Sequence, residues 1–195
     1  MRSYGLVLSA GSVVEPNSQY AFVKLNGAVV WGSSFGGIIF PHRRGVGIVV
    51  VDPFNCSALK SRTFDTYDIN ADAAMELTYY LQLVNHGGVI VAATADEATR
   101  NLNEAKATLL QLGADVSDVQ YRGAFAFVAQ KGFPAKTVLR KVLTERESAT
   151  TRPQFNVTIT GINTMMQQIG QHTLWGLPAV SIYKCKKKLS FYKNV

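Results

Sequence analysis

The sequence predicts an α/β (α+β) domain in which two helices pack on a mixed β-sheet, with a β-rich N-terminal addition and a C-terminal β extension. Apolar runs of strand length recur along the middle of the chain, and two segments between them repeat apolar residues at helical spacing. Both ends of the chain alternate apolar and polar residues. Composition places the domain boundary: residues 1–147 form the domain and residues 148–195 form the C-terminal arm, with 148–153 as a linker.

The N-terminal region is expected to form a hairpin. Residues 20–25 and 28–31 read as strands, and they flank the dipeptide Asn26-Gly27. This dipeptide suits a type I′ turn because both of its positions accept positive φ.

The middle of the chain alternates strands and helices. Apolar residues at helical spacing predict one helix over about 70–85, with Asp68 or Asn70 as its N-cap. The same spacing predicts a second helix over 98–112, closed by Gly113. The strands of this region are expected at 46–52, 61–67, 89–94 and 124–129.

The C-terminal part is expected to be largely extended. The stretch 136–147 resembles a helix in composition but remains ambiguous, whereas Phe155, Val157 and Ile159 alternate like a strand, and another strand begins at 180–183. We expect this arm to pack on the domain or on a neighbouring subunit, because unpaired apolar strands invite pairing.

Composition narrows the class of protein. With 47% hydrophobic and 17% charged residues, the chain has the composition of a globular protein. Most of the net charge of +7 comes from lysines in residues 181–195, and no nucleic-acid motif accompanies them, so we expect a solvated strand and no nucleic-acid partner. The apolar runs are too short to cross a bilayer, so no membrane insertion is expected, and no signal peptide is recognised at the N-terminus. Whether Cys56 and Cys185 pair stays open.

Short motifs associated with catalysis lack their usual context. Ser34 lies in a G-x-S-x-G match, but the residues that follow do not predict the helix that a nucleophile elbow requires. The three histidines have no metal-site spacing. Asp68, Asp72 and Glu76 suggest either paired carboxylates for glycoside hydrolysis or acids stabilised by a helix N-terminus, and we expect the latter. We therefore expect no enzymatic activity, no metal and no cofactor.

Four segments, taken in order, carry a family resemblance. They are Gly45–Asp52, Ser61–Tyr67, Tyr121-Arg122 and Phe125–Gly132. Over roughly residues 20–140 this order resembles the interleukin-like epithelial–mesenchymal-transition inducer (ILEI) domain. That domain is a non-enzymatic module of secreted cytokine-like proteins and of the stem of protein O-mannose N-acetylglucosaminyltransferase. The resemblance implies an α/β fold and sugar binding.

The resemblance also implies a set of site residues. By similarity to the transferase stem, Arg44, Asp96 and Arg122 would line a sugar pocket, and Tyr121 or Tyr67 would cover an apolar sugar face. The same charged residues could instead form a structural ion-pair network, and both alternatives stay open. Where the family has Trp-Arg-Asp-(Thr or Ser)-Trp, this chain has Tyr121-Arg122-Gly123-Ala124-Phe125, which leaves the identity of the ligand open.

We therefore predict a non-catalytic module that recognises a carbohydrate or surface polymer. Its expected partners are a glycan or surface polysaccharide and other protein subunits, in a homo- or hetero-oligomer. The expected context is a larger assembly such as a phage tail tip or fibre, with the virion as its location and an extracellular-type module as the alternative. The competing functions are a purely structural virion or assembly protein and a secreted cytokine-like signal.

Overall fold

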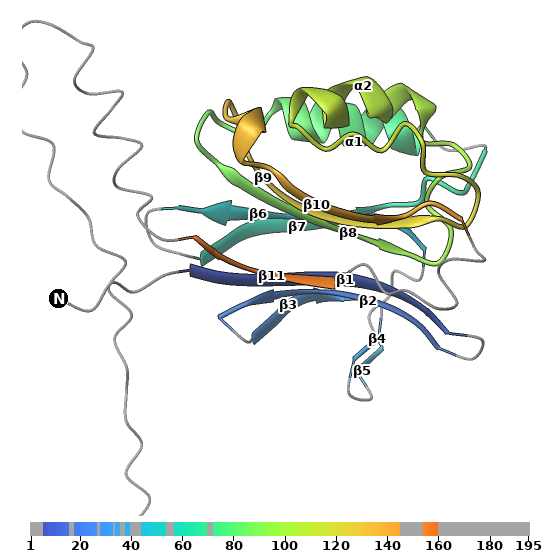
Figure 1. The fold of residues 1–195 in the computed structure, drawn as a ribbon, viewed down its shortest axis with the longest axis horizontal. Coiled ribbons are helices and arrows are strands. Elements are labelled where there is room, and N and C mark those ends of the chain that lie inside the picture. Colours follow the sequence, from blue (N-terminus) through green and yellow to red (C-terminus); the bar gives the residue numbers. More distant parts are fainter. Residues whose placement is uncertain are drawn as a thin grey trace, which may run out of the picture.

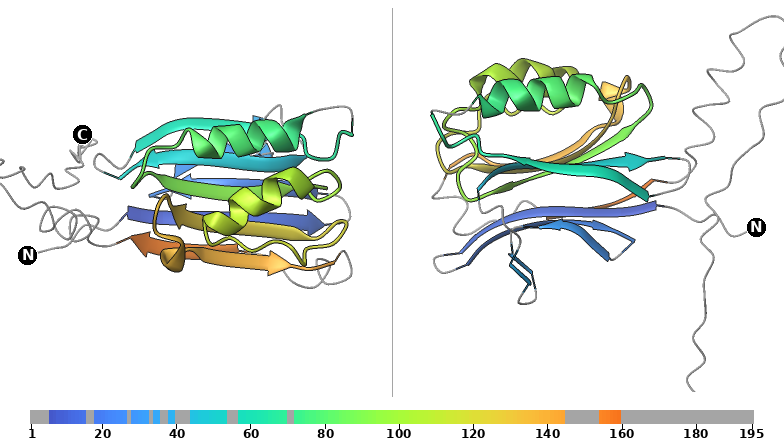
Figure 2. Two further views of the ribbon diagram at one scale, coloured as in Figure 1. Left: turned by 90° about the horizontal axis from the view of Figure 1, so that it is seen from above. Right: turned by 180° about the vertical axis from the view of Figure 1, so that it is seen from behind.

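The computed structural model of the chain describes residues 6–15, 18–26, 28–32, 34–35, 38–39, 44–53, 57–69, 72–144 and 154–159. Within these ranges the fold has three layers: a pair of helices, a five-stranded sheet and a four-stranded sheet (Figures 1 and 2). The five-stranded sheet is the middle layer, with the helices on one face and the four-stranded sheet on the other (Figure 1).

The middle sheet has the strand order β10-β9-β8-β6-β7. Its strands are β6 (Gly45–Asp52), β7 (Ser57–Phe64), β8 (Val89–Ala95), β9 (Ala124–Gln130) and β10 (Val138–Val142). The inner strands β6, β8 and β9 are buried along almost their whole length. This explains why they read as continuous apolar runs, because a strand that is covered on both faces has no polar face to alternate with.

The helices cover one face of this sheet. They are α1 (Ala73–Gln82) and α2 (Asn103–Gln111), and a short 3-10 turn, η1 (Pro134–Lys136), precedes β10. Leu77, Leu81 and Leu109 are fully buried against apolar residues of β6, β8 and β9. The apolar residues whose spacing predicted the two helices therefore include residues of the core.

The four-stranded sheet covers the opposite face, in the order β11-β1-β2-β3. Its strands are β1 (Leu6–Glu15), β2 (Ser18–Leu25), β3 (Ala28–Gly32) and β11 (Gln154–Ile159). The contact between the layers is close at Gly47 of β6, where a Cβ atom would lie 1.9 Å from the indole of Trp31. The Trp31 Nε1–H donates to Thr63 Oγ1 of β7 at 2.9 Å, so the indole spans the interface between the two sheets.

The predicted fold class is confirmed, including the N-terminal β addition and the C-terminal extension. The turn between β2 and β3 contains Asn26 at φ 51°, as the Asn-Gly hairpin predicts. Residues 154–159 of the C-terminal arm pair with β1 as β11, so this part of the arm packs on the domain as expected.

Three details differ from the predictions. The sheet expected to be mixed is antiparallel in every pairing between described strands, because the chain returns along 112–123 after α2 and enters β9 at the end where β8 finished. Helix α2 begins at Asn103 instead of residue 98, and α1 begins at Ala73 behind Asp72, not behind Asp68 or Asn70. The ambiguous stretch 136–147 contains β10, because Val138–Val142 pair with the otherwise open edge of β9.

Some predictions fall outside the described residues. These are the linker 148–153, the strand beginning at 180–183, both cysteines, His42 and His172.

Candidate functional site

Three segments that are far apart in sequence meet at one end of the middle sheet. Gly45 at the start of β6 pairs with Ala95 at the end of β8, which brings Arg44 and Asp96 to the same end. The start of β9 pairs with the end of β8 (Ala93 opposite Ala126), so Arg122, just before β9, lies at this end as well. The three charged residues suggested by the family resemblance therefore lie at one end of the sheet.

The electrostatics of Asp96 reflect this convergence. Burial raises the pKa of the Asp96 carboxyl above its ordinary value, and the charges of Arg122 and Arg44 oppose that rise. Both arginines therefore act on the same carboxylate. Asp96 adopts φ 50°, in the left-handed region that Asp tolerates better than most residues do.

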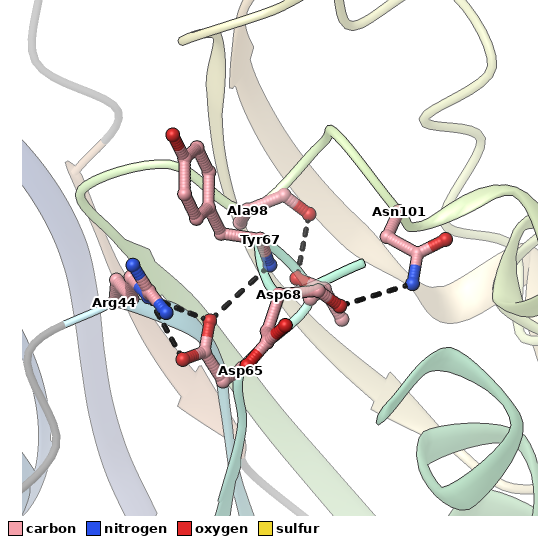
Figure 3. A network of polar contacts seen from close by, with 7 residues as sticks. Arg44, Asp65, Tyr67, Asp68, Ala98 and Asn101 are labelled. Carbon is pink, nitrogen blue, oxygen red and sulfur yellow. Dashed lines mark hydrogen bonds and ion pairs between the residues drawn. The ribbon is translucent and has the colours of Figure 1, made fainter. Parts of the chain in front are cut away.

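Arg44 is held by the loop that follows β7. Its Nε donates to both carboxylate oxygens of Asp65 at 2.8 Å, and this hydrogen bond raises the pKa of Arg44 above its ordinary value. Its guanidinium carbon also lies 4.6 Å from the centre of the Tyr67 ring. Figure 3 shows the guanidinium beside the Asp65 carboxylate, with Tyr67 rising from the same loop.

The loops after β7 and β8 are joined by further hydrogen bonds (Figure 3). The buried Thr66 hydroxyl donates to the carbonyl of Ala98 at 2.7 Å, and the Asn101 backbone N–H donates to the Thr66 carbonyl at 2.8 Å. The Asn101 side chain donates to the Asp68 carbonyl at 3.2 Å. These bonds fix the loop that carries Tyr67 against the loop that follows Asp96.

Glu97 organises the loop between Asp96 and α2. Its side chain is 2% exposed, and its Oε1 accepts the backbone N–H groups of Thr99 at 2.5 Å and Arg100 at 3.0 Å and the Thr99 hydroxyl at 2.6 Å. Its Oε2 accepts the backbone N–H of Arg122. Arg122 has φ 57°, an uncommon conformation for a long side chain, and the bond to Glu97 holds it there.

The two tyrosines have different surroundings. The Tyr67 ring contacts two guanidinium groups, that of Arg44 and that of Arg100, whose Cζ lies 4.8 Å from the ring centre. Tyr121 is 53% exposed, and the guanidinium carbon of Arg122 lies 5.8 Å from its ring centre. Tyr121 is therefore the more accessible of the two aromatic surfaces.

Asp65, Glu97 and Arg100 were missed by the sequence analysis. Asp65 lies inside a segment that carried the resemblance, Ser61–Tyr67, and Glu97 directly follows the candidate residue Asp96, but neither spacing nor periodicity marks them. The one available signal is their position just beyond a strand end, where a carboxylate often accepts backbone N–H groups two and three residues ahead.

Ser34, Asp72 and Glu76, which short motifs link to catalysis, have roles in the local structure. Ser34 lies in β4 (Ser34–Phe35), which pairs with β5 (Ile38–Ile39), so a strand hairpin stands where a nucleophile elbow needs a helix. Asp72 is the N-cap of α1, and Glu76 forms an ion pair with Arg62 of β7.

Across the described ranges, no three His, Cys, Asp or Glu residues are grouped so that they could hold a metal ion. Neither helix of those ranges has the length and apolar character that a membrane crossing requires.

Comparison with known proteins supports the resemblance. Residues 44–133 match the family profile described as Interleukin-like EMT inducer, and this segment contains all five candidate residues. The chain is 31% identical over 112 residues to a human (Homo sapiens) protein named "Cell migration-inducing and hyaluronan-binding protein" and 30% identical over 112 residues to the mouse (Mus musculus) protein of the same name. The matched part is 55% of this chain and only 8% of each relative, so the chain spans a small fraction of their length. The resemblance to the ILEI domain is confirmed for the matched segment.

Proposed function

We propose that this chain is a non-catalytic carbohydrate-binding module whose ligand lies over the end of the sheet that carries Arg44, Asp96 and Arg122. The observation that carries the proposal is the convergence of two arginines on one partly buried carboxylate, beside the exposed ring of Tyr121.

The side chains at this end of the sheet can form the contacts that a sugar requires. Guanidinium groups donate hydrogen bonds in fixed directions to ring hydroxyl and acetamido oxygens, and a carboxylate accepts from hydroxyl groups. An exposed aromatic ring can pack against the apolar face of a pyranose, and Tyr121 offers one directly beside Arg122. We assign this packing role to Tyr121, because the ring of Tyr67 already contacts two guanidinium groups.

The relatives add support for the class of ligand. Both are named as hyaluronan-binding proteins, and each is similar to this chain over 112 residues. A glycan on an extracellular or cell-surface polymer is the ligand that this supports, and we propose an extracellular-type setting for the module.

A single substitution separates binding from a structural network. We expect Arg122→Ala to weaken glycan binding, found first on a glycan array and then measured by calorimetry, by about 1–3 kcal/mol, because a charged hydrogen-bond partner is lost. The melting temperature should change little, since Arg122→Ala keeps the backbone N–H that donates to Glu97. Arg140→Ala, an exposed arginine on β10, is the matched control and should leave binding unchanged. A melting temperature that falls markedly in Arg122→Ala, with no glycan bound by the wild type, would support the structural network instead.

The absence of catalysis is part of this proposal. It is supported by the position of Ser34 in a strand hairpin. Purified protein should hydrolyse neither esters nor glycosides, and hydrolysis that is abolished by Ser34→Ala in a folded protein would refute the proposal.

A structural role in an assembly is the second candidate function. Met75, Tyr79 and Leu83 recur every four residues along α1 and are 39%, 58% and 75% exposed, which favours a protein contact on this helix. The more specific prediction is a subunit of a phage tail tip or fibre, and a secreted cytokine-like signal is the third candidate function. The neighbouring genes distinguish these two, because tail genes beside this gene would favour the tail subunit. Light scattering of the purified chain tests the assembly role, which predicts an oligomer that Leu83→Lys disrupts.

A further inference from the structure

Arg100 is a cation at the proposed site that is exposed and has no carboxylate partner within the described residues. The nearby arginine Arg44 differs in this respect, because its Nε binds Asp65. An exposed guanidinium without an acid partner is available to an anionic group of a ligand.

The side chain of Arg100 is positioned at both of its ends. Its backbone N–H donates to the buried carboxylate of Glu97 at 3.0 Å, which anchors the base of the residue. Its guanidinium carbon lies 4.8 Å from the ring centre of Tyr67, which holds the head by a cation–π contact. Because a positioned side chain loses less conformational freedom on binding, this arrangement favours recognition of an anion.

The ion pairs between described residues do not include Arg100. Asp65 is engaged by Arg44, and Glu97 is 2% exposed and surrounded by N–H and O–H donors. Asp96 lies close to two other cations, because the charges of Arg122 and Arg44 oppose the rise in its pKa that burial causes. Arg100 is left as the group that can meet a negative charge on a ligand.

We propose that Arg100, positioned by Tyr67 and Glu97, gives this site a preference for an acidic sugar, one that carries a carboxylate or a sulfate. This inference rests on the proposed carbohydrate-binding function and names the class of sugar. In this arrangement Tyr67 is a positioning residue for Arg100, and the sugar face packs on Tyr121.

The test compares an acidic glycan with its neutral counterpart. The probes are hyaluronan oligosaccharides and the same oligosaccharides with their carboxyl groups reduced to alcohols, with binding measured by calorimetry at low and moderate salt. Wild-type protein should bind the acidic form at least about tenfold more tightly, as expected for a charged hydrogen bond, and salt should reduce this difference. Arg100→Gln should abolish the preference by weakening binding of the acidic form, whereas the control Arg140→Gln should keep the preference.

Variants of Tyr67 test the positioning role separately. Tyr67→Phe keeps the ring and should keep the preference, whereas Tyr67→Leu should lose it. Both proteins must melt at temperatures close to that of the wild type for this comparison.

The outcomes distinguish this inference from the proposed function. Equal binding of the two probes by wild type, a preference that survives Arg100→Gln, or a glycan array on which only neutral sugars bind would overturn the acidic-sugar inference while leaving the carbohydrate-binding function intact. An array on which no glycan binds, acidic or neutral, would overturn both.

Discussion

The carboxylate of Glu97 accepts a hydrogen bond from the backbone N–H of Arg122, a residue 25 positions away in the sequence. Glu97 is 2% exposed and also binds the N–H groups of Thr99 and Arg100, so a single side chain holds two loops of the site together. The position of Arg122 therefore depends on a residue that a ligand does not need to touch.

Replacing Glu97 should damage stability and the site together. Glu97→Gln puts an amide NH₂ group where one of the carboxylate oxygens accepts hydrogen bonds, so at least one buried N–H loses its acceptor. We expect a loss of about 2–4 kcal/mol in the free energy of unfolding, measured with urea, because hydrogen bonds to a buried charged group are lost. Glu104→Gln, an exposed residue of α2, should change this free energy by less than about 0.5 kcal/mol. Equal effects of the two substitutions would show that Glu97 does not hold the loops.

Two leucines of the α1 region offer a matched test of the core. Leu81 is fully buried, whereas Leu83, two residues later, is 75% exposed. Leu81→Ala should cost about 2–5 kcal/mol in chemical denaturation, because it leaves a cavity between α1 and the sheet. Leu83→Ala should cost less than about 0.5 kcal/mol. A reversed order would mean that the helix presents a different face to the sheet.

The contact between Gly47 and Trp31 should tolerate no added atom. Gly47→Ala places a methyl group against the indole, and we expect a loss of about 1–3 kcal/mol from the strain of overpacking. Trp31→Leu in the same chain should recover part of this loss, because a smaller side chain leaves room for the methyl group. The coupling energy from the double-mutant cycle measures the effect, and additive losses would contradict direct contact.

Asp96 should make stability depend on pH in the direction opposite to most acids. Burial raises the pKa of Asp96 above 3.8, so the folded state favours the protonated form, and stability is lost as pH rises through the raised pKa. Asp96→Asn, which also tolerates positive φ, should therefore be more stable than wild type at pH 7, and the difference should disappear as pH falls below about 4.

A second aspartate supplies the opposite control. A hydrogen bond from Ser117 lowers the pKa of Asp115, so its contribution to stability is present at neutral pH and is lost as pH falls through the lowered pKa. Asp115→Asn should accordingly be no more stable than wild type at pH 7. The melting temperature of Asp96→Asn should rise above that of the wild type as pH increases past about 4. That of Asp115→Asn should stay at or below the wild-type value at pH 7 and approach it only as pH falls below about 4.

Local patterns in the sequence predicted most of the fold. The Asn26-Gly27 turn, the apolar run of β6 and the helical spacing around Leu77 each depend on neighbouring residues, and each was found. The stretch at Val138–Val142 was not, because it becomes a strand only by pairing with the distant strand β9. Helix α2 begins at Asn103, five residues after the predicted start at 98, because the Glu97 carboxylate accepts hydrogen bonds from the N–H groups of Thr99 and Arg100 in a turn.

The candidate site was predictable only in part. Arg44, Asp96 and Arg122 were found through the family resemblance, and strand register explains why they meet. Arg100 and Glu97 escaped notice because their importance depends on contacts with Tyr67 and Arg122, which lie 33 and 25 positions away. Contacts of this kind leave no periodic signal in a single sequence.

The middle sheet is apolar on both faces. The segment that matches the family is therefore shorter than the segment that is needed to bury both faces. The family match spans residues 44–133, and the four strands that cover the second face all lie outside it. On that face Val49, Val51, Val89 and Val91 are completely or almost completely buried. A fragment cut at the limits of the match would present this face to water and associate through it. Any protein that shares only this segment must cover the same face with residues of its own. The cover needs only to be flat and apolar, so it is free to diverge in sequence while the core that it protects is retained.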